Sequence, residues 1–71
     1  MIKTSMAKIW EKKIDKVSYM ISLVQEVING TPEDNIELLS GLLEYRSDLK
    51  EINKKFITAY ISVVNYESSI T

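Results

Sequence analysis

Apolar residues recur at alternating steps of three and four along most of this 71-residue chain, and the pattern is interrupted once. An α-helix brings residues at this spacing onto one face, so the pattern predicts two amphipathic helices. The row of apolar residues on each helix that meets the other helix is called its seam. The predicted seam of the first helix is Ala7, Trp10, Ile14, Val17, Ile21, Val24 and Ile28. That of the second is Leu38, Leu42, Tyr45, Leu49, Ile52, Phe56, Ala59, Val63, Tyr66 and Ile70.

The interruption is Asn29-Gly30, followed directly by Thr31-Pro32-Glu33-Asp34. Glycine in the left-handed conformation commonly ends a helix, and threonine before proline and two acids is typical of a helix start. We therefore predict a first helix over about 5–29, a turn at 29–31, a second helix over about 32–66 and a frayed tail at 67–71. The fold class is all-α: one domain, 1–71, forming an antiparallel, coiled-coil-like two-helix hairpin whose second helix is longer.

A tight turn at Gly30 also predicts how the helices pair. Val24 is expected near Leu38, Val17 near Tyr45 and Ala7 near Phe56, so the second helix would extend about ten residues, roughly 15 Å, beyond the first. The expected centre of the seam is Ile14, Val17, Ile21, Leu42, Tyr45 and Leu49.

The segment expected to extend beyond the first helix is apolar on nearly every side, which predicts contact with another polypeptide chain. Both helices also carry apolar residues beside their seams, more than a two-helix contact uses. Three possibilities remain open: a second copy covers this surface, giving a four-helix bundle; a different protein covers it; or the hairpin is a self-contained monomer. The predicted partner-binding residues are Phe56, Ile57, Tyr60, Ile61, Val63 and Val64.

Composition argues against the common catalytic and metal chemistries. The chain has no cysteine and no histidine, so we predict no enzyme activity, catalytic residue, metal site or cofactor. Glu37, Glu44 and Glu51 recur every seventh residue, which favours a solvated helix face over a carboxylate site. A net charge of −1 predicts no nucleic-acid partner, and no small-molecule substrate is expected. The apolar runs are too short for membrane insertion, and no secretory signal is visible, so a cytoplasmic location is expected.

A short cysteine-free hairpin with a Gly/Pro turn and a longer, tyrosine-containing second helix resembles the small co-chaperones of type III secretion needle subunits. The resemblance implies a protein that binds a helical-repeat chaperone and keeps a needle subunit monomeric until export. The stretch TPEDNIELLSGLLEY is also similar to the proline turn, leucines and tyrosine of the needle subunits themselves. That second likeness, like a homodimeric regulator, implies a self-associating hairpin.

Overall fold

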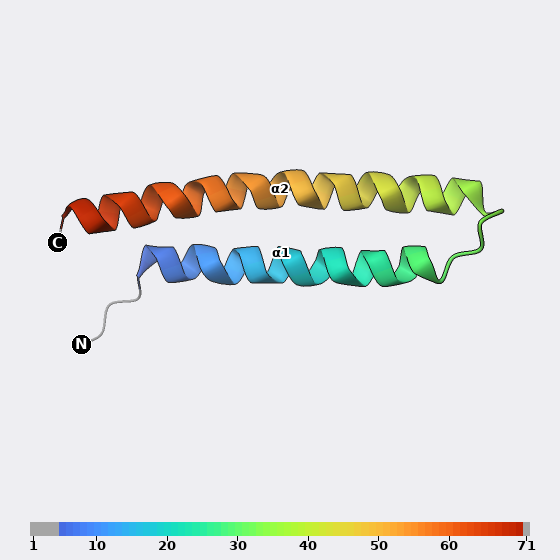
Figure 1. Ribbon diagram of the computed structural model, residues 1–71, viewed down its shortest axis with the longest axis horizontal. Helices are drawn as coiled ribbons and strands as arrows, with labels where there is room; N and C mark the ends of the chain where they lie inside the picture. Colours follow the sequence, from blue (N-terminus) through green and yellow to red (C-terminus); the bar gives the residue numbers. More distant parts are fainter. Residues whose placement is uncertain (1–4, 71) are drawn as a thin grey trace.

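The protein is two long antiparallel helices lying side by side (Figure 1). This computed structural model describes residues 5–70, in which α1 is Met6–Asn29 and α2 is Ile36–Ser69. The hairpin is narrow, with extents of 56 × 21 × 11 Å. The start of α1 and the end of α2 lie together at the end of the hairpin away from the turn (Figure 1). The predicted all-α hairpin with a longer second helix is confirmed.

The link between the helices differs from the predicted tight turn at 29–31. Gly30 has φ −89° and ψ −2°, which is right-handed, so the expected left-handed glycine is wrong. The reason is Thr31, whose amide donates to the Ile28 carbonyl at 3.1 Å and whose hydroxyl donates to the Val27 carbonyl at 2.6 Å. Because Thr31 satisfies carbonyls at the end of α1, the chain leaves the helix without reversing its handedness.

Helix α2 begins four residues later than predicted and ends later as well. Pro32 and Asn35 close a separate turn, in which the Asn35 amide donates to the Pro32 carbonyl at 3.1 Å. Asn35 then caps α2, since its side chain accepts a 3.4 Å hydrogen bond from the Leu38 amide. At the other end the helix runs to Ser69, so residues 67–69 are helical; Thr71 lies outside the described residues.

The core of the hairpin is small. Val17, Val24 and Leu49 are buried, with exposed fractions of 5–9%, and Ile21, Ile28, Leu42 and Phe56 pack around them half-buried. Ile14 is also half-buried, so five of the six residues predicted at the centre of the seam are placed correctly. The exception is Tyr45, which is 46% exposed.

The pairing of the helices is displaced from the predicted one. Asn53 of α2 lies opposite Ser18 of α1, with a 3.2 Å hydrogen bond, whereas the prediction set Val17 opposite Tyr45. Each α1 residue therefore meets a position about nine residues further along α2 than expected. The six residues of the link, 30–35, contribute to this shift, because they delay the point at which α2 starts to run back along α1.

Candidate interaction surface

One side of the seam is closed by polar contacts that repeat every seventh residue. Arg46 Nη1 donates to Gln25 Oε1, Asn53 Nδ2 donates to Ser18 Oγ at 3.2 Å, and the Tyr60 hydroxyl donates to Glu11 Oε1 at 3.3 Å. These three pairs are called the polar ladder. Since both helices supply residues at a seven-residue spacing, the ladder fixes the register of the antiparallel pair.

A fourth interhelix contact extends the same row to the beginning of α1. Ser5 caps α1 by accepting a 3.1 Å hydrogen bond from the Ala7 amide, and its hydroxyl donates to Glu67 Oε2 at 2.8 Å. Glu67 Oε1 also accepts from the Ala7 amide at 3.3 Å. A carboxylate from α2 thus lies at the positive end of the α1 dipole, which stabilises both the cap and the pairing.

The polar ladder changes which face of α2 meets α1. Leu42, Leu49, Phe56 and Val63 lie on the seam as predicted, but their neighbours there are Leu39, Arg46, Asn53, Tyr60 and Glu67. The periodicity predicts a different row on the seam, made of the residues that directly precede these neighbours. That row lies about 100° around the helix from them. Its placement on the seam is wrong for Leu38, Tyr45, Ile52 and Tyr66, which are all exposed.

This rotation of α2 brings two exposed apolar rows to the same side of the hairpin. On α1, the ladder residues Ser18 and Gln25 each follow a buried valine, whereas Met20 and Val27 each precede a seam isoleucine, so they lie on the opposite side. On α2, Tyr45 and Ile52 lie on that same side, away from the ladder. The resulting surface is called the turn-side apolar patch. It consists of Met20, Leu23, Val27, Leu38, Tyr45 and Ile52, each 40–52% exposed.

The partner-binding residues predicted from the sequence do not project beyond α1, and that premise is wrong. Tyr60 contacts Glu11, and the Phe56 ring packs against Trp10 with centroids 5.5 Å apart. Ile57 and Ile61 are 41% and 53% exposed. Val63 and Val64 are half-buried. Contact of these six residues with another chain stays a prediction, with Ile57 and Ile61 the most available.

On the side of the seam that carries the turn-side apolar patch, a lysine covers the aromatic pair in the other half of the hairpin. Lys13 Nζ lies 5.9 Å from the Trp10 ring centroid and 6.0 Å from that of Phe56. This distance suits a cation–π contact, and the lysine stem shields the rings. On the same face, near the end of the hairpin away from the turn, Ile9 and Tyr66 are exposed.

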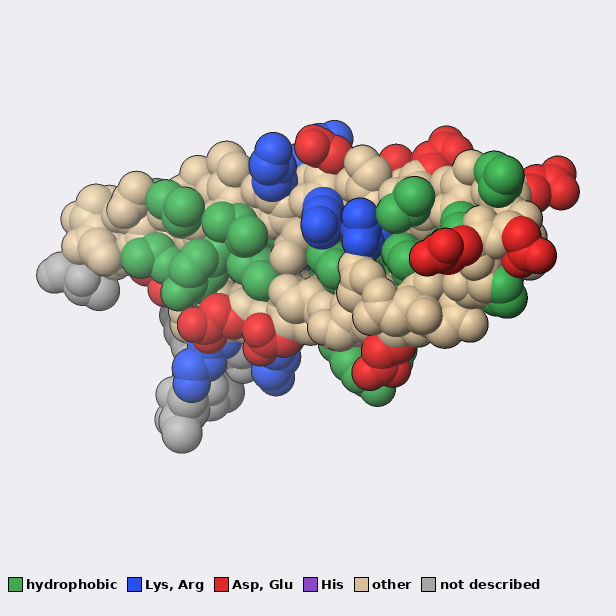
Figure 2. Space-filling view, turned by 45° about the vertical axis from the view of Figure 1, so that its right-hand side comes forward, with side chains coloured by type: hydrophobic (Ala, Val, Ile, Leu, Met, Phe, Trp, Pro, Cys, Tyr) green, Lys and Arg blue, Asp and Glu red, His purple; other side chains and the backbone are tan. Residues whose placement is uncertain are grey.

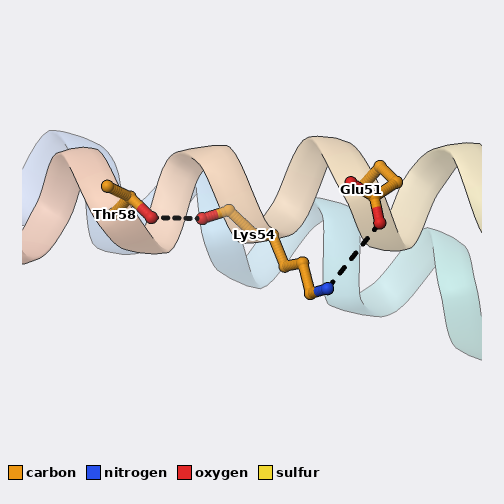
Figure 3. A network of polar contacts seen from close by, with 3 residues as sticks. All are labelled: Glu51, Lys54 and Thr58. Atoms are coloured by element: carbon orange, nitrogen blue, oxygen red, sulfur yellow. Dashed lines mark hydrogen bonds and ion pairs between the residues drawn. The ribbon is translucent and has the colours of Figure 1, made fainter.

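The outer face of α2 is charged and exposed to solvent. Lys54 Nζ lies 3.7 Å from Glu51 Oε1, and the Thr58 hydroxyl donates to the Lys54 carbonyl at 3.0 Å (Figure 3). An exposed ion pair of this kind contributes little to stability. Glu37, Glu44 and Glu51 are all exposed, as expected for a solvated face.

One titratable group is perturbed by the ladder. The charge of the Glu11 carboxylate raises the pKa of the Tyr60 phenol above its usual value of 10.0, and desolvation of the phenol and its hydrogen bond to Glu11 raise it further. The negative carboxylate disfavours a phenolate beside it, so the neutral donor is the favoured form.

Over residues 5–70 the surface has no pocket, and no three acidic side chains come together where they would hold a metal ion. Neither α1 nor α2 has a stretch long and apolar enough to cross a membrane.

Comparison with protein-family models, with curated proteins and with solved structures finds no match to this chain. Functional inference therefore depends on the surface itself. The signal that would have located this surface is the seven-residue spacing shared by Arg46, Asn53 and Tyr60 with Gln25, Ser18 and Glu11.

Proposed function

We propose that this protein is a non-enzymatic interaction module that packs the turn-side apolar patch against helices of another polypeptide chain. The observation that supports the proposal is that six large apolar side chains on one side of the seam are 40–52% exposed, while only three residues of the described chain are buried. Contiguous apolar surface of this kind is typical of a protein–protein interface. Two helices with a common apolar side offer the groove-and-ridge surface on which a further helix packs.

More specifically, the protein would act as a co-chaperone of a type III secretion needle subunit in the cytoplasm. In that role the patch would bind the helical-repeat chaperone or the needle subunit, and burial of apolar area would supply the affinity. Ile57 and Ile61 would then offer a second contact.

The test is co-expression with a needle subunit and its helical-repeat chaperone, followed by co-purification. Tyr45→Lys with Ile52→Lys places two charges in the patch and should abolish capture. The matched control is Ser40→Lys with Ser47→Lys, which adds the same charges at the same seven-residue spacing on another exposed face of α2. Equal capture by both double variants, with helicity retained, would show that the patch is not the interface.

A self-associating hairpin is the second candidate function. The observation that favours it is the unequal distribution of charge along the hairpin: the half near the turn is acidic and the other half is basic.

A further inference from the structure

We infer that a second copy of this chain covers the turn-side apolar patch, with the two hairpins packed face to face and their turns at opposite ends. This inference rests on the proposed function and names the partner. The first reason is the spacing of the patch: Tyr45 and Ile52 are seven residues apart, as are Met20 and Val27. Rows with this period pack best against helices with the same period, and this chain supplies two such helices.

The second reason is that charge is divided along the length of the hairpin. The turn half, residues 20–51, carries seven acidic and two basic side chains. The open half, residues 5–19 and 52–70, carries six basic and three acidic side chains. Figure 2 shows acidic side chains gathered towards the turn end of the molecule. Parallel packing of two copies would oppose like charges, whereas antiparallel packing opposes unlike charges over the whole length.

The third reason is where these charges lie relative to the patch. Asp48 is exposed on α2 about 50° beyond Tyr45 and Ile52 around the helix, and Glu44 and Glu51 lie about 100° beyond them, on the outer face of α2. On the same side of the hairpin, the open half presents Lys13 and Lys16. In the antiparallel pair, the acidic edge of each patch faces the lysines of the other copy, and apolar Ile9 and Tyr66 lie over the patch itself.

The available area is adequate for a stable pair. The hairpin measures 56 by 21 Å, so one face can supply the roughly 800 Å² that each partner buries in a typical specific interface. Two-fold symmetry makes this contact closed, because each turn half meets one open half and none remains unpaired.

Charge reversal at the two ends tests the inference by sedimentation equilibrium. Glu44→Lys with Glu51→Lys should weaken the homodimer at least tenfold, because the turn half then carries five acidic and four basic side chains and loses most of its attraction for the basic open half. Lys13→Glu with Lys16→Glu should weaken it similarly, because both ends become acidic. A mixture of the two double variants should form a heterodimer in preference to either homodimer, because one of its two contacts pairs an unaltered acidic turn half with an unaltered basic open half. Ser40→Lys with Ser47→Lys adds half as much positive charge to the turn half, on another exposed face of α2, and should weaken the dimer much less.

Spin labels test the orientation, since the chain has no cysteine of its own. A label at Glu33→Cys, beside the turn, should give an inter-copy distance approaching the 56 Å length of the hairpin. A label at Lys55→Cys, near the middle, should give a short one. A short distance at Glu33→Cys would overturn the antiparallel arrangement.

Three results overturn the inference in distinguishable ways. A wild-type chain that stays monomeric but captures another protein through Tyr45 and Ile52 leaves the proposed function standing and removes the second copy as partner. A dimer that neither charge reversal weakens would show that the opposite charges of the two halves do not hold the copies together. A dimer that persists in the Tyr45→Lys, Ile52→Lys variant removes the patch from both proposals.

Discussion

The two sides of the seam differ in how their side chains are packed. On one side, Arg46, Asn53 and Tyr60 reach polar partners on α1 and close the contact. On the other, Tyr45 and Ile52 stand beside Met20 and Val27 with no ladder across them, and all four remain exposed. A closed polar side and an open apolar side belong to a hairpin whose register is fixed internally and whose apolar surface is left for another chain.

The cost of this arrangement falls on the stability of the isolated hairpin. Polar side chains at seam positions contribute specificity of register more than net free energy, because each must be desolvated before it is paired. With three buried residues in the described part of the chain, the free energy of unfolding is expected to be low for a chain of this length.

The largest expected effect comes from the apolar centre between the two sides. Leu49 is the most buried of residues 5–70, at 5% exposure, so Leu49→Ala should lower the free energy of unfolding by about 2–5 kcal/mol. Leu43→Ala, a control at an exposed leucine of the same helix, should change it by less than about 1 kcal/mol. Thermal melts followed by circular dichroism, at a concentration where copies do not associate, measure both. Equal losses would mean that the seam has been placed wrongly.

Replacing a ladder residue with an apolar one should have the opposite effect and raise the free energy of unfolding. Asn53 Oδ1 is buried and has no hydrogen-bond partner. Asn53→Leu removes that unsatisfied atom and adds apolar area, so it should raise the free energy of unfolding by about 1 kcal/mol, although the Ser18 bond is lost. Asn65→Leu, at an exposed position, corrects for helix propensity in urea unfolding experiments. A net loss relative to that control would show that the ladder stabilises rather than only aligns.

The contact at the open end should have a similar or smaller effect. Glu67→Ala removes the acceptor for the Ser5 hydroxyl and the Ala7 amide, and should lower the free energy of unfolding by about 1 kcal/mol. Glu51→Ala removes a carboxylate whose partner, Lys54, is exposed, and should cost about 0.5 kcal/mol or less. If urea unfolding gives the same value for both, Glu67 does not cap α1.

The smallest expected effect is a pH dependence of the ladder. Folding raises the pKa of Tyr60 above 10.0, so its contribution to stability is fully present below pH 10 and is lost as the pH rises through the folded-state pKa. Tyr60→Phe removes this titration, and its melting temperature should fall less steeply than that of the wild type between pH 9 and about 11.5. Identical slopes would contradict the Glu11–Tyr60 contact.

Much of this fold can be predicted from periodicity alone. The seam of α1, including Trp10, Val17 and Val24, follows from steps of three and four, and so do Leu42 and Leu49 on α2, because the geometry of a single helix decides which residues share a face. The break near Gly30 was equally visible. These features are local, and the tertiary fold did not override them.

The sequence by itself did not determine which row beside Leu42 and Leu49 faces α1, nor the register of the pair. The row with Tyr45 and Ile52 is the more apolar, and within one helix it is the better seam. Only across the pair do Arg46, Asn53 and Tyr60 meet partners at matching intervals, and only the six-residue link puts those partners at the same level. The physical reason is that a polar side chain belongs on the seam only if a hydrogen-bond partner lies opposite it on the other helix. The periodicity of one helix does not show where that partner lies.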